Sequence, residues 1–538
     1  MSTAEPSQVL AGLRVTSLGT LASRVLGMVR DMATASLLGL SGNGVMDAFV
    51  IAFRIPNLFR RLFGEGALAA SYLPVLSARL QHSRTEAWQL TSATLVWLAT
   101  VLAALVLLAE GACAAIWCLY GDLPGMTLLV GLTAVMLPYL FFICLAAQVS
   151  GTLHALAHFS TPALTPTLLN ICWLVAICLV APRLTTDKET QAYILAVSVL
   201  VAGALQLAAQ VVMLRRLGFC FDYNWAASRH ALLQIVASLG PMVLGLAVTQ
   251  INGFFDSLMA WFLAAPAEGS ARIEWLGGVV TYPLRQGAAA AIYYGERLYQ
   301  LPLGLLGVAV ATVIFPLLSR HAARGRHDKL GEDLSLGLRL VLFLGIPAGA
   351  GLVLLSHPLS TLMFEHGEFT SSDASRVAGM ISCYGLGVWA FCALPVIVRG
   401  FYALGDQRTP LRAGAKAMLA NIALNLLLVW PMAEAGLALA TSLAAVLQTT
   451  LLTAEFSRRW GNLRGGEIGR TAAATLLATA CMLLGGCLTL ACLPSAPGNL
   501  VVVLRVALPM AVGAAIFFAV SHKLRIRELD LLLGRTLG

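Results

Sequence analysis

The chain of 538 residues has little charge, since Asp, Glu, Lys and Arg make up only 11% of it, against 59% hydrophobic residues. A soluble domain carries roughly 25% charged residues, so this composition excludes an ordinary soluble protein. Apolar runs of about 20 residues recur from end to end, and each is long enough to span a hydrocarbon core of about 30 Å. The mean hydropathy of +0.82 agrees. The sequence therefore predicts an integral membrane protein without a soluble domain.

Two further features are missing. There is no CxxC motif, and the eleven cysteines lie mostly inside apolar runs, which indicates buried small hydrophobic residues instead of a disulfide framework. The first twenty residues have neither a basic segment nor a small-residue cleavage site, so we expect no secretory signal and a first span that is retained.

Apolar runs bounded by turn and charge signals predict an all-α polytopic membrane protein with about 14 transmembrane helices. The expected helices cover residues 10–38, 45–79, 88–119, 126–153, 161–182, 191–214, 231–264, 286–319, 335–357, 375–404, 411–431, 436–457, 470–493 and 499–522. An even number of spans places both termini on one side of the membrane. The connection 265–287 is long, and no role is assigned to it.

Lysine and arginine decide which side that is. The connections on one side hold 21 of these residues and those on the other side hold five, namely Arg183, Lys188, Arg272, Arg285 and Arg376. By the positive-inside rule both termini are cytoplasmic. The net charge of +9 is then explained by topology, and no nucleic-acid partner is expected.

The chain also repeats itself. The segment HALAHFSTP (154–162) matches YALGDQRTP (402–410), 248 residues later, and YLPVLSAR (72–79) matches IFPLLSRH (314–321). Together with RVLG (24–27) and MVLG (242–245), these matches predict two six-helix halves, 10–220 and 230–460, followed by two extra helices within 468–523. Because six is even, the halves have the same orientation, as in transporters built from parallel repeats whose substrate site lies between the halves.

Arginines occur deep inside several predicted spans, where a charge costs about 2.5–3.5 kcal/mol even on lenient insertion scales. At 1.5 Å per residue, Arg24 lies about 15 Å, Arg60 about 20 Å and Arg297 about 16 Å into a membrane core. An intramembrane charge indicates a functional site, and guanidinium groups suit phosphate oxygens. We therefore expect a hydrated cavity for a phosphate or pyrophosphate. The alternative is that these arginines pair with carboxylates or extend to an interface.

Three long segments carry a family resemblance: SRVLGMVRD, DAFVIAFRIPNLFRRLFGEGALAASYLPVL and YYGERLYQLPLGLLGVAVATVIFPLLSRHA. They resemble signature segments of the MurJ (MviN) family of lipid II flippases, in the multidrug/oligosaccharidyl-lipid/polysaccharide exporter superfamily. The resemblance runs through essentially the whole chain, including the two extra helices. It implies a monomeric inner-membrane protein of peptidoglycan and cell-wall biogenesis and of cell shape, without enzymatic activity.

The resemblance also implies the substrate and its site. The substrate would be lipid II, undecaprenyl-pyrophosphate carrying the disaccharide-pentapeptide, moved to the outer leaflet by alternating access. The family's cavity residues correspond to Arg24, Arg30, Arg60, Arg297 and Asp47. The extra helices would form a groove for the polyprenyl tail, in contact with membrane lipids.

The same resemblance suggests a sodium site. The matching positions are Asp256, Asn421, Asn425 and Thr441, of which Asn425 replaces an acid. Loss of a carboxylate weakens the case for a hard cation, which prefers charged oxygen ligands. The alternatives are therefore a bound sodium ion, or no cofactor and a protonated Asp256.

Three rival functions remain. A cation-coupled drug exporter of the same superfamily would need an acidic cavity and would normally end after twelve helices. A membrane enzyme acting on prenyl pyrophosphates would normally hold Mg²⁺ with an acidic cluster, and the sequence has no DDxxD-like run. A passive structural protein gives no reason for arginines at one depth.

Overall fold

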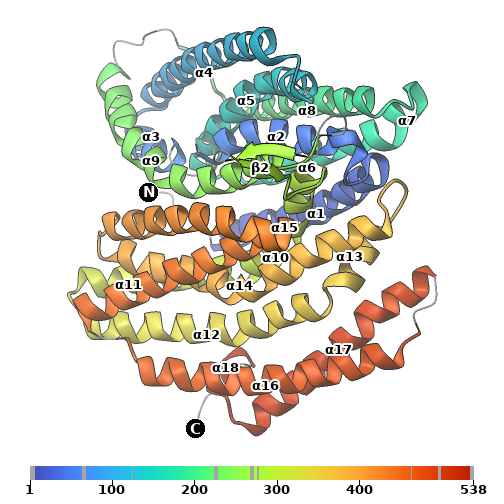
Figure 1. Ribbon diagram of the computed structural model, residues 1–538. Coiled ribbons are helices and arrows are strands. Elements are labelled where there is room, and N and C mark those ends of the chain that lie inside the picture. Colours follow the sequence, from blue (N-terminus) through green and yellow to red (C-terminus); the bar gives the residue numbers. More distant parts are fainter. Residues whose placement is uncertain are drawn as a thin grey trace. The chain divides into compact units, whose positions relative to one another are not determined.

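The computed structural model describes residues 6–62, 68–123, 125–222, 224, 228–266, 272–275, 278–461, 463–494 and 498–533. Apart from one short hairpin, the regular structure in these ranges is helical, which confirms the predicted fold class. The chain packs as two compact units, the first comprising Met1–Ala289 with His366–Glu368 and the second Ala290–Glu365 with Phe369–Gly538. Figure 1 colours the first unit from blue to green and the second from yellow to red.

The helices of the first unit follow the predicted runs. They are α1 (Pro6–Leu38), α2 (Val45–Phe59), α3 (Leu68–His82), α4 (Arg84–Tyr120), α5 (Met126–Ala155), α6 (Ser160–Val175), α7 (Ala181–Leu184), α8 (Lys188–Arg216) and α9 (Arg229–Phe262). The predicted halves 10–220 and 230–460 divide the chain by sequence repetition and stay a prediction. Packing places α9 in the first unit, against α2, α3 and α4.

The second unit also consists of helices. It consists of α10 (Ala288–Pro302), α11 (Ala309–Ala323), α12 (His327–Leu354), α13 (Ser356–Phe364), α14 (Ser371–Ala403), α15 (Arg408–Trp460), α16 (Gly465–Cys492), α17 (Asn499–Lys523) and α18 (Arg527–Leu532). The short helices α13 and α18 are additions to the expected elements. Wider π-helical turns at Ala176–Val180 and Leu303–Val308 interrupt two of the predicted helices.

Polar caps explain several helix starts. The Ser83 side chain accepts a hydrogen bond from the backbone of Thr85 at the start of α4. Thr370 and Asp373 form a capping box at the start of α14. Such caps satisfy backbone N–H groups that have no partner within the helix. The two helices therefore each begin four residues before the predicted starts at 88 and 375.

α15 is two helices joined at a sharp break. Ala433 has a left-handed φ of 49° inside it, two residues after Pro431, which cannot donate a backbone hydrogen bond. A Cβ atom at Gly436 would collide with the carbonyl oxygen of Leu428, so the tight return requires glycine there. This break confirms the turn expected between the predicted helices 411–431 and 436–457.

The long connection 265–287 contains a hairpin. Its strands are β1 (Arg272–Trp275) and β2 (Gly278–Thr281), which pair antiparallel with Arg272 opposite Thr281. At its base, the Ala265 backbone N–H donates to Leu284 at 2.9 Å. The hairpin was not among the expected elements, and it belongs to the first unit.

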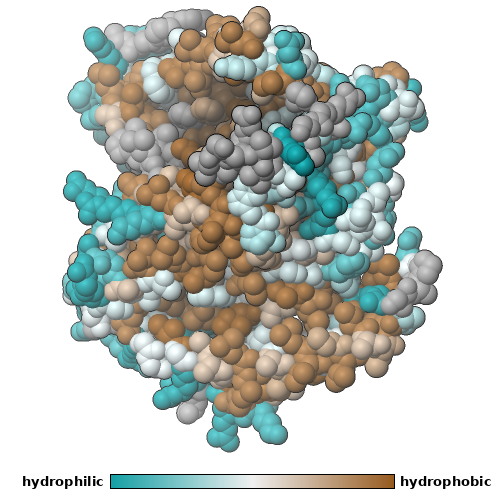
Figure 2. Space-filling view, in the orientation of Figure 1, coloured by the Kyte–Doolittle hydropathy of each residue, from teal (hydrophilic) through white to brown (hydrophobic). Residues whose placement is uncertain are grey.

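Within the described ranges, ten helices are long and apolar enough to cross a membrane. There are eleven if Leu21–Leu38 and Gly42–Leu62, which meet at 104°, form one span. The predicted number of about 14 spans stays a prediction. Figure 2 shows hydrophobic surface over the α16 and α17 pair, where Leu484, Leu488 and Leu500 are all more than 65% exposed. A surface of this kind suits contact with lipid.

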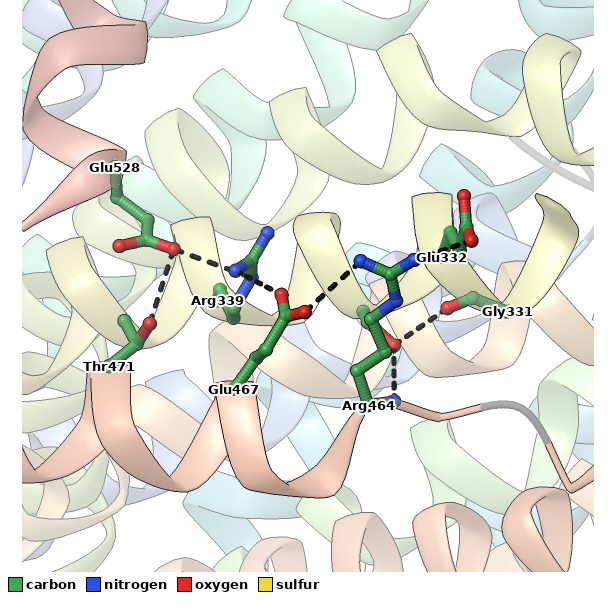
Figure 3. A network of polar contacts seen from close by, with 8 residues as sticks. Gly331, Glu332, Arg339, Arg464, Glu467, Thr471 and Glu528 are labelled. Atoms are coloured by element: carbon green, nitrogen blue, oxygen red, sulfur yellow. Dashed lines mark hydrogen bonds and ion pairs between the residues drawn. The ribbon is translucent and has the colours of Figure 1, made fainter. Parts of the chain in front are cut away.

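A chain of alternating charges connects the extra C-terminal helices to α12 (Figure 3). Arg339 of α12 pairs with Glu467 of α16 at 2.7 Å and with Glu528 of α18 at 3.3 Å. Arg464 then pairs with both Glu467 and Glu332. Since Glu528 is only 1% exposed, its charge needs these partners. The network therefore joins α12, α16 and α18 at one end of the unit.

Candidate functional site

Arg30 is the most enclosed of the predicted site arginines, with 7% of its surface exposed. Its Nε and Nη2 atoms donate to Oδ1 of Asp31 at 3.0 and 2.6 Å, and Nη1 donates to Asn170 at 3.1 Å. The guanidinium carbon lies 4.4 Å from the centre of the Trp173 ring. A buried arginine requires this degree of pairing and hydrogen bonding. In this structure Arg30 is thus part of the packing between α1 and α6.

Asn170 and Trp173 complete this cluster from α6, and sequence reasoning missed both. The Asn170 amide also donates to the Ser23 carbonyl oxygen at 2.9 Å, so it contacts α1 at two places. The Trp173 ring packs edge-on against Phe49 and Phe53, with centroids 5.3 and 5.1 Å away. An Asn and a Trp three residues apart in an apolar helix lie on the same face. This spacing is the sequence feature from which the two residues could have been predicted to share a site.

Arg24 differs sharply from Arg30, although both belong to α1. Its side chain is exposed, and it makes no hydrogen bond or ion pair with the part of the chain that the structure describes. A guanidinium group in this state presents its full set of donors to a ligand. Of the predicted arginines on α1, Arg24 is therefore the one available to an anion.

Arg60 lies where α2 widens into a π turn, at residues 60–62. Its Nε donates to Asn57 on the same helix at 3.0 Å. The neighbouring Arg54 donates to the carbonyl oxygen of Gly253 at 2.8 Å, and Arg61 donates to Gln250 at 3.3 Å. Both of these partners belong to α9. The arginines on either side of Arg60 therefore connect α2 to α9.

Asp47 lies in the first turn of α2 and is 2% exposed. Its Oδ2 accepts a hydrogen bond from the backbone N–H of Gly287 at 2.6 Å. Gly287 has a left-handed φ of 86°, and a Cβ there would lie 2.8 Å from the Leu40 carbonyl oxygen. The carboxylate thus holds the segment after the β-hairpin against the start of α2. A negative charge also suits the N-terminus of a helix.

Arg297 lies on α10 in the second unit, partly buried, with its guanidinium carbon 4.2 Å from the centre of the Tyr293 ring. Stacking on an aromatic ring holds an arginine in place while leaving its edge able to donate. The predicted meeting of Arg297 with Arg24 and Arg60 of the first unit stays a prediction.

Three of the four predicted sodium ligands come together on α15. Asn425 donates to Asn421 at 3.0 Å, and Asn421 donates to the Thr441 hydroxyl at 3.3 Å, across the break in the helix. They supply neutral amide and hydroxyl oxygens, a ligand type that a hard cation accepts. Asp256, which is 2% exposed, lies on α9 in the first unit. Its approach to the other three residues stays a prediction.

Comparison with known proteins agrees with this architecture. The model of the family "Lipid II flippase MurJ" matches residues 34–506. A probable lipid II flippase MurJ of Vibrio cholerae is 34% identical over 452 residues, 81% of each chain. A lipid II flippase MurJ of Burkholderia cenocepacia is 30% identical over 80% of this chain and 81% of its own length.

Solved structures show the same fold. A lipid II flippase MurJ in an inward closed conformation aligns with a TM-score of 0.73 at 24% identity, over 95% of this chain and 99% of that one. An inward-facing multidrug resistance MATE family transporter of the MOP superfamily aligns with a TM-score of 0.66 at 12% identity, over 82% of this chain and 96% of that one.

The long apolar helices and the family match together identify a multi-pass membrane transporter. The chain belongs to the lipid II flippase MurJ family, which confirms the family predicted from its sequence. A flippase family is a transporter family and not an enzyme family, as expected.

Proposed function

We propose that this protein flips lipid II from the cytoplasmic to the outer leaflet of the inner membrane, and so supplies peptidoglycan synthesis. Membership of the family over residues 34–506 is the observation that carries this proposal. The exposed guanidinium of Arg24 within a long helix supports it, because a charge at that position is costly unless it serves a ligand or a partner.

We further propose alternating access, with Arg24, Arg60 and Arg297 binding the pyrophosphate while Arg30 and Asp47 position the surrounding helices. Charge-assisted and bidentate bonds from arginine suit phosphate oxygens, and they give the site its preference for this headgroup. The excess of 21 over five cations between the two sets of connections supports cytoplasmic termini. The functional unit is a monomer.

Depletion of this protein is expected to stop outer-leaflet display of lipid II while the cytoplasmic pool accumulates. The measurement is surface labelling of lipid II in depleted cells, compared with cells re-expressing the wild-type protein. Cells that keep normal surface labelling and grow without shape defects after depletion would show that the assignment is wrong.

We also propose that Asn421, Asn425 and Thr441, together with Asp256, bind sodium. A ligand that binds only the folded state raises its stability with concentration. Sodium is therefore expected to raise the melting temperature of the purified protein above that in potassium at equal ionic strength. Asn421→Leu and Asp256→Asn should each abolish this difference, whereas the exposed control Asp122→Asn should retain it. Equal melting temperatures of the wild-type protein in the two salts would contradict a sodium site.

A further inference from the structure

A basic hollow lies in the second unit where α14 leads into α15. Its volume is about 540 Å³, and its lining includes Arg408, Arg412 and Arg459 with Asp406 and Thr409. Figure 2 shows hydrophilic side chains gathered along the left edge of this unit, where the helices of α15 end in Figure 1. None of these residues belongs to the proposed lipid II or sodium site.

The acidic residue of the hollow, Asp406, already has hydrogen-bond and ion-pair partners. Asp406 accepts from the Thr409 backbone at 3.0 Å and from its hydroxyl at 2.6 Å, and pairs with Arg459 at 3.0 Å. Burial raises the pKa of the Asp406 carboxyl, but the bonds from Thr409 and the charge of Arg459 outweigh it and hold the pKa below its usual value. Asp406 and Arg459 therefore remain a paired anion and cation.

The other two arginines of the hollow are Arg408 and Arg412. They lie one helical turn apart at the start of α15, and both are exposed. Neither guanidinium group makes a hydrogen bond or ion pair with any residue in the described ranges, although the Arg408 backbone N–H donates to the Asp406 carboxylate. Two neighbouring guanidinium groups repel each other unless an anion lies between them, so the hollow favours a negatively charged ligand.

The internal repeat shows that the loop does not need these arginines. In the matching segment, 248 residues earlier, His158 contacts the Thr161 hydroxyl at 2.8 Å, as Asp406 contacts Thr409 in the later copy. The positions of Arg408 and Arg412 are taken there by Ser160 and Leu164. The same helix start thus forms in both copies, while only the second carries the pair of cations.

Apolar surface continues from the two arginines along the same helix. Leu411 is 39% exposed and Leu419 is 64% exposed. Residues three, four, seven and eight apart share one helical face, so Arg408, Arg412 and the exposed Lys416 lie on the same face as Leu411 and Leu419. A ligand that fits this face has an anionic head and an apolar body. Basic residues at the end of a membrane-spanning helix are typical of sites for anionic lipid headgroups.

We propose that the basic hollow binds the phosphate headgroup of an anionic membrane phospholipid, with Arg408 and Arg412 on the phosphate and the acyl chains along Leu411 and Leu419. The second copy of the repeat is thereby fixed to one leaflet by a lipid that is not the transported substrate.

Native mass spectrometry of the detergent-purified protein tests this proposal. Phosphatidylglycerol and phosphatidylcholine are each titrated onto the wild type, R408Q/R412Q and the control R320Q/R324Q, which removes two exposed arginines at the end of α11. We expect R408Q/R412Q to bind phosphatidylglycerol about ten-fold or more weakly, since two charge-assisted bonds are lost. The control should stay within about twofold of the wild type, as expected for residues outside the site.

Two further measurements complete the test. R408K/R412K keeps the charge without the planar donor geometry and should bind with intermediate affinity. It also serves if R408Q/R412Q does not fold. Inorganic phosphate should not displace the lipid, whereas displacement at equal concentration would identify a site for free phosphate and overturn the proposal. Equal affinities of the wild type and R408Q/R412Q, or equal loss in R320Q/R324Q, would overturn it as well.

Discussion

Arg24→Ala is expected to weaken lipid II binding by about ten-fold or more while leaving the melting temperature of the protein unchanged. The side chain is exposed and makes no polar contact within the described structure, so its removal costs no internal interaction. Hydrogen bonds to a charged group contribute roughly 1.5–3 kcal/mol each, and about 1.4 kcal/mol corresponds to ten-fold in affinity. Binding of purified lipid II and thermal unfolding are measured on the same preparation.

Two further variants complete this experiment. Arg24→Lys should restore binding only in part, because lysine keeps the charge and loses the planar pair of donors. Arg297→Ala should weaken binding to a similar extent, with some loss of packing on Tyr293. Normal binding by both alanine variants would assign these arginines to the scaffold and remove them from the substrate site.

Asp31→Ala is expected to be among the most destabilising single substitutions in the first unit. Removing one partner of a buried ion pair leaves an uncompensated charge and costs about 3–5 kcal/mol. Asn170 and Trp173, which also contact Arg30, are neutral groups. The loss is measured as a lower melting temperature in detergent, with the exposed Asp122→Ala as the control, expected within about 0.5 kcal/mol of the wild type.

A second substitution separates packing from substrate binding. Replacing both charges, in Arg30→Met with Asp31→Leu, should recover much of the lost stability, since hydrophobic residues of similar volume often replace a buried pair without net loss. An Asp31→Ala protein that melts like the wild type would show that the Arg30–Asp31 pair contributes little. A stable double variant that no longer binds lipid II would restore Arg30 to the substrate site.

Much of the fold was predictable because a long apolar run in the sequence by itself predicts a membrane-spanning helix. A helix in lipid satisfies its own backbone hydrogen bonds, so length and hydropathy locate it. The break in α15 was also readable, from Pro431 and the polar Glu434 between two apolar runs. The β-hairpin within 265–287 and the short helices α13 and α18 were missed, since pieces of 4 to 9 residues are too short to have a distinctive hydropathy pattern.

The candidate site was predictable in kind and not in detail. The cost of charge in a membrane marked Arg24, Arg30 and Arg60 as unusual, but it could not tell them apart. Arg30 pairs with its neighbour Asp31 and is held against α6 because Asn170, 140 residues away in the chain, accepts a hydrogen bond from it. Asp47 is engaged by Gly287, 240 residues away. Arg24, six residues before Arg30, has no such partner among the described residues.

The sequence by itself determined that this is a membrane protein of long helices, which family it belongs to, and which side chains are too costly to be incidental. These properties depend on composition and on contacts between near neighbours in the chain. Only the tertiary structure decided which arginines are buried in packing and which are exposed to a ligand. The reason is physical: the packing of distant helices decides which charged groups become buried and which further polar groups lie within about 3 Å of them, and local sequence does not contain those distances.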